Sequence, residues 1–187
     1  MNMLAVIEAI DRATADKRVY IATGVGTHQS IVARHFTWDY PHRMFLSSCG
    51  HGTMGSGLPY LMGAWLADPS RIPILITGDG SFAMEAPGLK TAEDCGIPVR
   101  VFVLDNHAFG IVHQFESLQG IGHPATERPG TEWDVIAMGY GAKSWAPELE
   151  HIGRMIEEPE LSIAVFEVED IGVWPILEAG KLEMTHE

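Results

Sequence analysis

The sequence predicts an α/β fold in which a parallel sheet is covered by helices on both faces, the arrangement called doubly wound. Short apolar runs typical of buried strands alternate along the chain with helix-length stretches. Three glycine-rich turns each follow one of these runs, at 23–29, 50–57 and 78–80. Because parallel strands end at the same edge of a sheet, the three turns should gather where open α/β folds bind ligands.

The first half of the chain should supply three of the strands. Leu4, Ile7 and Ile10 have the spacing of a helix face, and Asp16-Lys17 ends that helix. The elements expected in order are a helix over 3–15, a strand over 19–22, a helix to about 35, a strand over 45–48, a helix over 57–66 and a strand over 72–77.

The second half should complete the sheet. The expected elements are a helix after residue 80, a strand over 100–104, a long functional loop with some helix over 107–130, a helix over 133–138, a strand over 142–145, a helix over 148–157 and a strand over 162–169. No repeat, low-complexity tract or linker divides the chain. Its length therefore predicts a single domain over residues 1–187.

Composition excludes several functions. The net charge is −13 and Lys and Arg form no cluster, which argues against nucleic acid and against an anionic membrane surface as partners. No apolar stretch approaches the roughly 20 residues of a membrane span, and no signal peptide is recognisable, so a cytoplasmic location is expected. Cys49 and Cys95 show no pairing pattern, which fits a reducing compartment. Cys95 is expected to be structural, and Cys49 to be a small buried thiol.

Two polar side chains follow successive predicted strands. Asp79 comes after one strand and Asn106 after the next, so both should reach the same sheet edge. A carboxylate and an amide oxygen suit a hard cation, and Gly78 and Gly80 would let a phosphate approach a helix N-terminus. The pattern indicates Mg²⁺ holding a diphosphate. The alternative is an ordinary turn in which the glycines allow sharp geometry and Asp79 caps the helix.

Residues 78–106, GDGSFAMEAPGLKTAEDCGIPVRVFVLDN, resemble the thiamine-diphosphate motif. Other segments extend the resemblance, nearly end to end, to the diphosphate-binding domain of acetolactate synthase-like thiamine enzymes. These segments are TGVGTHQ at 23–29, SSCGHGTMGSGLP at 47–59, LDNHAFGIVHQ at 104–114 and VWPILEAG at 173–180. The family usually has Asn-Asn where this chain has Asp105-Asn106, and since the second residue is the ligand, the departure is mild. The resemblance implies the thiamine-diphosphate-binding fold.

The resemblance also implies the cofactors, thiamine diphosphate and Mg²⁺. The metal ligands would be Asp79, Asn106 and the main-chain carbonyl of Ala108. The diphosphate would lie against Val25, Gly26, Thr27 and His28, and Ser81 would add a hydroxyl and a helix-start amide. The remaining cofactor-binding positions would be Gly78, Gly80, Phe109 and Gly110.

The family needs a bent cofactor, so that the exocyclic amine of the pyrimidine reaches the thiazolium carbon. Such proximity can lower a barrier by about 7 kcal/mol or more. The resemblance makes Met54 the bulky prop under the bend, makes the carbonyl of Gly52 an acceptor for the aminopyrimidine, and places Met84 by the pyrimidine. Most methionines are core filler, so only their position within the motifs favours these roles.

Four histidines, at 28, 51, 107 and 113, are concentrated near the expected site, without the spacing of a zinc site. His51 replaces an apolar residue common in acetolactate synthases, so it could donate a proton or hold a substrate carboxylate, with packing as the alternative. Ile111, Val112 and Phe115 occupy the stretch that lines the substrate pocket in the family. Phe115 stands where acetolactate synthases often have Trp, which leaves the acceptor open.

The resemblance covers only part of a complete enzyme. In the family, a glutamate that protonates the pyrimidine comes from a separate pyrimidine-binding domain, and a middle domain holds FAD. This sequence contains neither, and Met1 coincides with the point where the diphosphate domain would begin. We therefore expect a naturally split enzyme, a heterotetramer or larger, in which a partner subunit supplies the glutamate and this chain binds no flavin. An excised fragment is the alternative.

The expected activity is decarboxylation of a small 2-oxo acid. Either protonation to an aldehyde or addition to a second carbonyl compound would follow, and carboligation is slightly preferred because of the resemblance. A simple decarboxylase subunit of the sulfopyruvate or phosphonopyruvate type is the first alternative. A non-catalytic regulatory subunit is the second, although Asp79, Asn106 and Met54 together argue against a decayed site.

Overall fold

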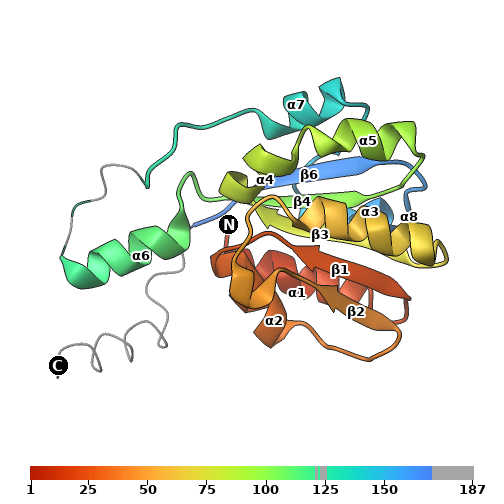
Figure 1. Ribbon diagram of the computed structural model, residues 1–187, viewed down its shortest axis with the longest axis horizontal. Helices are drawn as coiled ribbons and strands as arrows, with labels where there is room; N and C mark the ends of the chain where they lie inside the picture. The colour runs from red at the N-terminus through yellow and green to blue at the C-terminus, as the bar shows by residue number, and fades with distance from the viewer. Residues whose placement is uncertain (121, 123–125, 170–187) are drawn as a thin grey trace.

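A computed structural model describes residues 1–120, 122 and 126–169 of the chain. It contains a six-stranded sheet of order β2-β1-β3-β4-β6-β5 in which all neighbouring strands are parallel (Figure 1). The strands are β1 (Val19–Thr23), β2 (Arg43–Leu46), β3 (Ile72–Gly78), β4 (Arg100–Asp105), β5 (Lys143–Trp145) and β6 (Ser162–Glu167). The predicted α/β fold with a doubly wound parallel sheet is confirmed.

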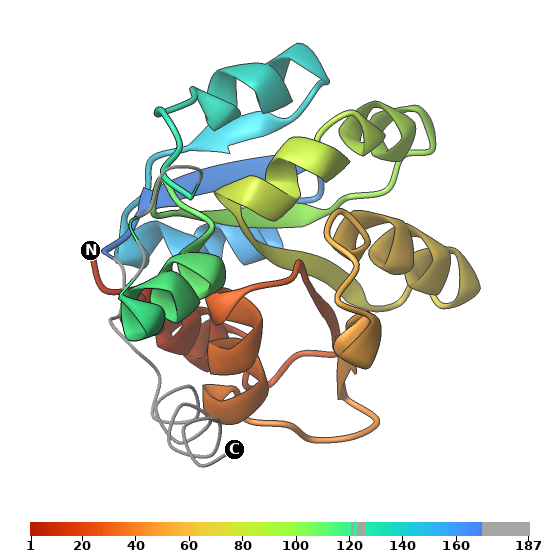
Figure 2. The ribbon, with the colours of Figure 1, turned by 60° about the vertical axis from the view of Figure 1, so that its left-hand side comes forward.

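Helices cover both faces of the sheet (Figure 2). On one face lie α1 (Met3–Ala13), α2 (Thr27–His35) and α8 (Ile152–Glu157). On the other lie α3 (Gly57–Ala67), α4 (Asp79–Glu85), α5 (Gly88–Asp94) and α7 (Trp133–Gly139). Helix α6 (Gly110–Gln119) follows β4 at the carboxyl edge of the sheet. None of the helices within the described part of the chain is both long enough and apolar enough to cross a membrane.

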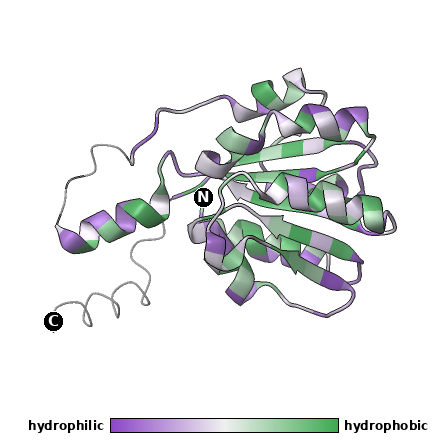
Figure 3. Cartoon of the chain, in the orientation of Figure 1, coloured by the Kyte–Doolittle hydropathy of each residue, from purple (hydrophilic) through white to green (hydrophobic). Residues whose placement is uncertain are grey.

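Alternating side chains of the strands fill two cores. In β3, Ile74 and Ile76 pack with α1, α2 and α8, whereas Leu75 between them packs with α3 and α4. A strand buried on both faces must be apolar throughout, which is why the hydrophobic residues concentrate along the central strands (Figure 3). The same property made these strands recognisable in the sequence.

The structure differs from the predicted elements in several places. The stretch after residue 80 forms two helices instead of one, because the break falls at Pro87, and proline cannot continue the hydrogen bonding of a preceding turn. Over 107–130, where a loop with some helix is predicted, the helical part is the ten-residue helix α6. Strand β2 begins at Arg43, two residues earlier than expected.

The prediction of a buried thiol at Cys49 is wrong. Cys49 is exposed, and so is Cys95. Cys49 opens a short 3₁₀ turn, Cys49–His51, that buries none of its residues. A sequence window rich in glycine and small residues does not reveal which face of such a turn meets the core.

Candidate cofactor site

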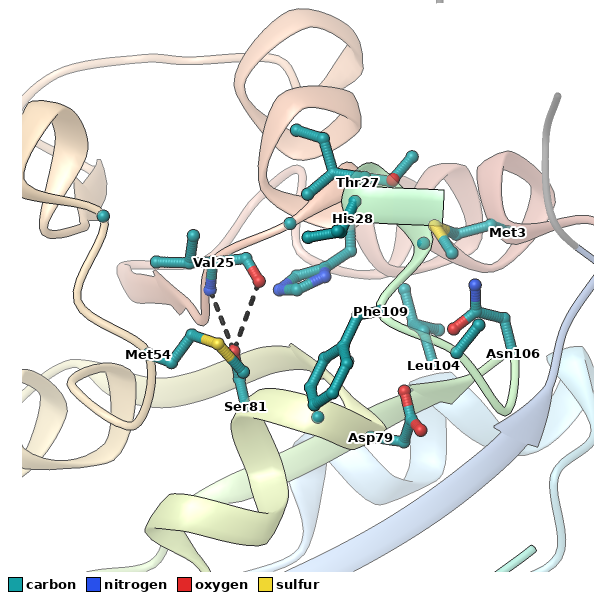
Figure 4. A pocket seen from close by; sticks show the side chains of 18 residues that line it. Met3, Val25, Thr27, His28, Met54, Asp79, Ser81, Leu104, Asn106 and Phe109 are labelled. Atoms are coloured by element: carbon teal, nitrogen blue, oxygen red, sulfur yellow. Dashed lines mark hydrogen bonds between the residues drawn. The ribbon is translucent and has the colours of Figure 1, made fainter. Parts of the chain in front are cut away.

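A pocket lies at the carboxyl edge of the sheet, where the turns after β1, β3 and β4 meet the loop before α3 (Figure 4). The register of the strands causes this meeting, since Gly78 at the end of β3 pairs with Leu104 in β4. The residues that follow each strand therefore emerge together. The pocket is lined by Met3, Val25, Gly26, Thr27, His28, Gly52, Met54, Gly78, Asp79, Gly80, Ser81, Leu104, Asn106, Ala108, Phe109, Gly110, Ile111 and Val112.

The turns after β1 and β3 are hydrogen-bonded to each other. The main-chain N–H of Val25 donates to Ser81 Oγ at 3.1 Å, and this hydroxyl lies 3.3 Å from the carbonyl of Val25. The two turns approach so closely that a Cβ on Gly24 would lie 2.5 Å from Ser81 Cβ. Gly26, at φ 144°, adopts a conformation open mainly to glycine and is the N-cap of α2. Glycine is thus required here by close approach and by backbone geometry.

His28 forms one wall of the pocket. It is 4% exposed, and a Cβ on Gly78 would lie 3.1 Å from its Nδ1. Burial lowers the pKa of His28 to about 4, against a smaller opposite effect of the Gly24 backbone, so the ring is neutral at pH 7. Its Nε2 is buried and makes no hydrogen bond to any of the residues that the structure describes. A buried polar atom of this kind at a pocket wall suits a hydrogen bond to a ligand.

The acidic end of the pocket is formed by Asp79 and Asn106. Asp79 is 3% exposed, and burial, followed by the charge of Asp105, raises the pKa of Asp79 to about 6. Arg128 opposes this shift, because its Nε lies 3.5 Å from Asp79 Oδ2. Asp105 itself accepts a hydrogen bond from the N–H of His107 at 2.9 Å. The site thus holds a desolvated carboxylate that gains from a cation.

A strap of residues 126–128 pairs with the loop that carries Ala108. The N–H of Arg128 donates to the carbonyl of His107 at 2.7 Å, and the N–H of Phe109 donates to the carbonyl of Thr126 at 2.8 Å. In antiparallel pairing, the residue between two such bonds directs its own N–H and C=O to the opposite side. The carbonyl of Ala108 therefore faces away from the strap. The guanidinium of Arg128 lies 5.0 Å from the centroid of the Phe109 ring.

The other end of the pocket is made by the loop before α3. Gly52 and Gly55 have φ values of 61° and 78°, and Met54 between them lines the pocket. A Cβ on Gly55 would lie 2.9 Å from Met84 Cβ, so the loop is pressed against α4. Figure 4 shows Met54 extending toward Ser81, on the opposite side of the pocket from Asn106.

The structure brings most of the predicted site residues into this pocket and leaves three outside its lining. His51 is exposed, Met84 is 58% exposed and Phe115 is 44% exposed. Asp79 is not the helix cap of the alternative interpretation, because Gly78 is the N-cap and Asp79 is the first residue of α4. The segment at 173–180 lies outside the described residues.

Three residues near the pocket were not anticipated. Met3, at the start of α1, and Leu104, at the end of β4, line it, and Arg128 contacts Asp79. Leu104 immediately precedes a predicted ligand pair and could have been included on that ground. Met3 reaches the pocket because α1 packs against the sheet, and Arg128 reaches Asp79 because the strap pairs with residues 107–109. No local pattern in the sequence indicates either contact.

The residues fit a diphosphate bound through a divalent cation. A carboxylate and an amide side chain line one end, as suits a hard cation, and the turns after β1 and β3, which the Val25–Ser81 bond holds together, line the pocket beside them. Gly80 has no side chain at a point where a Cβ would lie 2.8 Å from the Phe109 ring, so the backbone and the ring can approach closely. The unpaired Nε2 of His28 completes a polar wall.

We expect the buried His28 to make stability depend on pH. The pKa of His28 is about 4 in the folded state and lies below the ordinary value of 6.5, so the unfolded chain binds more protons in that range and stability should rise with pH. His28→Gln removes this dependence. The free energy of unfolding of the variant minus that of the parent chain should therefore be about 2 to 3 kcal/mol larger at pH 4 than at pH 7.5. Urea unfolding at both pH values measures it, and a constant difference would contradict a buried neutral ring.

Comparison with known proteins agrees with the geometry. Residues 24–162 match the family model described as "Thiamine pyrophosphate enzyme, C-terminal TPP binding domain". The chain is 42% identical over 157 residues to the acetolactate synthase large subunit of Haemophilus influenzae, which covers 83% of this chain and 26% of that protein. It is 38% identical over 135 residues to the acetolactate synthase isozyme 1 large subunit of Escherichia coli, covering 71% and 24%.

A solved structure shares the fold. The crystal structure of benzoylformate decarboxylase from Polynucleobacter necessarius superposes with a TM-score of 0.79 at 22% identity, covering 89% of this chain and 33% of that one. The chain thus spans about a quarter of the synthase subunits that it matches. With the matched region extending over most of its length, the chain belongs to the thiamine pyrophosphate enzyme family, as an acetolactate synthase-like C-terminal domain.

Proposed function

We propose that this chain is the cofactor-binding subunit of a two-subunit thiamine-diphosphate enzyme that decarboxylates a small 2-oxo acid and joins the product to a second carbonyl compound. One observation carries the proposal. A single pocket holds Asp79 and Asn106 at one end and Gly52 and Met54 at the other. When bound, thiamine diphosphate would supply a nucleophilic carbon and an electron sink for decarboxylation.

The acidic end would hold the cofactor through Mg²⁺. Asp79, Asn106 and the carbonyl of Ala108 would be the protein ligands, which is consistent with the orientation of Ala108 beside the strap. The main-chain amides of Gly26, Thr27, His28 and Ser81 would bind the diphosphate oxygens, and the buried Nε2 of His28 would lie beside them. Water remains the natural additional ligand, because Mg²⁺ keeps part of its hydration shell.

The opposite end would orient the reactive part. Met54 would support the bend of the cofactor, and the carbonyl of Gly52 would accept a hydrogen bond from the pyrimidine amine. The positive φ of Gly52 turns the loop at this point, which supports the assignment. Ile111 and Val112, at the start of α6, would form the apolar side of the substrate pocket.

Carboligation is the preferred outcome because the relatives quoted above are named acetolactate synthases. Decarboxylation alone is the competing activity. Product analysis separates the two, first with pyruvate alone and then with pyruvate and an added aldehyde. We expect a hydroxyketone product in the second mixture, and release of a free aldehyde in both mixtures would identify a simple decarboxylase.

In the proposed arrangement a partner subunit supplies the activating glutamate, which is not among the described residues that line the pocket. Helix α3 offers a surface for it. The helix has no charged residue, exposes Tyr60 and Leu66, and forms a shallow groove with Phe45 and Leu46 of the edge strand β2. A helix that is apolar on all sides is usually covered. We infer that the pyrimidine-binding subunit docks here, next to the loop bearing Met54, in a heterotetramer or larger assembly.

The decisive test is reconstitution. The purified chain alone should bind Mg²⁺ and thiamine diphosphate but release no carbon dioxide from pyruvate. Adding the product of a neighbouring reading frame, expected to be a pyrimidine-binding chain with the activating glutamate, should restore release. Robust decarboxylation by the chain alone would refute the split-subunit arrangement, and failure to bind the cofactor would refute the function itself.

Changing the apolar face of α3 should weaken assembly. Leu66→Arg combined with Tyr60→Arg places two charges on a surface that would be desolvated, and we expect at least about tenfold weaker association with the partner. Leu149→Arg, on the opposite side of the sheet beside α8, is the matched control. Analytical ultracentrifugation of the mixed subunits measures both. Equal association of the two variants would place the partner elsewhere.

A further inference from the structure

A buried glutamate joins three parts of the cofactor pocket. Glu85, at the end of α4, is 3% exposed. Its Oε2 accepts the N–H of Leu58 at 2.9 Å, and its Oε1 accepts the hydroxyl of Thr77 at 2.7 Å. Thr77 lies one residue before the turn at 78–81, and Leu58 lies one residue inside α3. The carboxylate therefore links the metal end of the pocket to the helix that follows the Met54 loop.

Helix α3 depends on this carboxylate at its start. Its N-cap residue, Ser56, makes no capping hydrogen bond, because its hydroxyl donates to the carbonyl of Thr53 instead. The first amides of a helix need an acceptor when they are buried. Leu58 obtains one from Glu85, and the Gly57 amide also favours the charged form of this carboxyl against its burial. Glu85 thus acts as a helix cap supplied from another element.

The Met54 loop is braced internally, and its end at Gly57 packs against β1 and β3, where a Cβ would lie 2.7 Å from Leu75 Cδ1 and 3.1 Å from the carbonyl of Thr23. The N–H of Thr53 donates to Ser48 Oγ at 2.9 Å, and Ser56 closes the other end of the loop. Next to Glu85, Met84 Cβ lies so close to the loop that a Cβ on Gly55 would be 2.9 Å away. Because the loop is braced, it should keep its shape if it shifts, and the two hydrogen bonds of Glu85 tie its end directly to the strand that leads into the turn at 78–81.

We propose that Glu85 is a positioning residue, whose carboxylate fixes the loop bearing Gly52 and Met54 at a set distance from the 78–81 turn and so sets the length of cofactor that the pocket accepts. This role rests on the proposed function. Glu85 does not line the pocket and would not touch the cofactor. It acts through its hydrogen bonds to Leu58 and Thr77. If these bonds are lost, the Met54 loop can shift while the diphosphate end stays in place, and the pocket becomes longer or shorter.

Two ligands of different length test the role in the full chain. Inorganic diphosphate with Mg²⁺ engages only the 78–81 end, whereas thiamine diphosphate with Mg²⁺ needs both ends. Isothermal titration gives both dissociation constants and their ratio. Glu85→Ala should weaken thiamine diphosphate by about tenfold or more and leave inorganic diphosphate within about twofold, since a tenfold loss corresponds to one displaced contact of ordinary strength. Glu85→Gln should keep the parent ratio, because its amide can accept from Leu58 and donate to Thr77.

Further variants keep the test decisive. Thr77→Val removes the bond from β3 to Glu85, together with a longer one to the carbonyl of Gly78, and leaves the bond to Leu58 in place. It should give an intermediate ratio, and it serves as the test if Glu85→Ala does not fold. Asp94→Ala, at an exposed position at the end of α5, is the control. Equal weakening of both ligands by Glu85→Ala would overturn the positioning role and indicate a general fold defect. If the parent chain binds inorganic diphosphate and thiamine diphosphate with equal dissociation constants, the positioning role is overturned but the diphosphate site stands. If the parent chain binds neither ligand, the proposed function itself is refuted.

Discussion

Replacing Asp79 by asparagine should abolish Mg²⁺-dependent binding of thiamine diphosphate and stabilise the metal-free protein at neutral pH. Burial raises the pKa of Asp79 from 3.8 to about 6, so the folded state holds a proton that the unfolded chain has released between these values. Stability therefore falls as pH rises through this window. Asparagine has no proton to lose, and the gain above pH 6 should reach up to about 3 kcal/mol. A residue that lowers the free energy of unfolding relative to its substitute is typical of a functional site.

The two effects need separate measurements. Isothermal titration should show at least about a 100-fold loss of affinity, equivalent to about 3 kcal/mol, because a charged ligand to a hard cation is removed. Urea unfolding in chelator at pH 4 and pH 7.5 should show the stabilisation only at the higher value. Asp94→Asn is the exposed control and should change neither quantity. Unchanged affinity in Asp79→Asn would reject the metal assignment.

Among glycine-to-alanine substitutions in the turns that line the pocket, Gly24→Ala should disrupt the pocket most. The new Cβ would lie 2.5 Å from Ser81 Cβ and 2.7 Å from Thr77 Oγ1, and both partners are held by β3 and α4. Such overpacking costs about 1 to 3 kcal/mol. It also separates Val25 from Ser81, so cofactor affinity should fall together with the melting temperature.

Gly153→Ala provides the matched comparison. Gly153 lies within α8, where a Cβ meets nothing within 4 Å, so alanine should stabilise the helix by about 0.5 to 1 kcal/mol. Thermal unfolding and isothermal titration of both variants check the pair. A neutral Gly24→Ala would show that the turns after β1 and β3 are not fixed against each other.

The central strands could be predicted because their environment leaves little choice of residue. β1 and β4 are buried on both faces, so residues 19–22 and 101–104 form nearly continuous apolar runs that are recognisable in the sequence. The parallel arrangement then determines which residues share an edge. For this reason the sequence alone assigns Asp79 and Asn106 to one site, although a pair of helices and a strand separate them.

Contacts made across the fold escaped prediction. Arg128 reaches Asp79 only because residues 126–128 pair with 107–109, and Glu85 reaches Leu58 only because α4 packs beside α3. Neither contact has a periodic or local signature. Helix α6 was expected to be mostly loop because its buried side is very small: Gln114 is its one buried residue. An amphipathic pattern needs a wider apolar face to be recognised.

The bond between Val25 and Ser81 joins turns that are 56 positions apart in the chain. The vitamin-derived ligand can therefore associate only after β1 and β3 have come together, and it should have no affinity for the unfolded polypeptide. By mass action, a concentration of 100 times Kd would then protect the native state by about 2.7 kcal/mol. Cells short of thiamine should carry more of this protein in a protease-sensitive form, so its abundance should follow the vitamin supply.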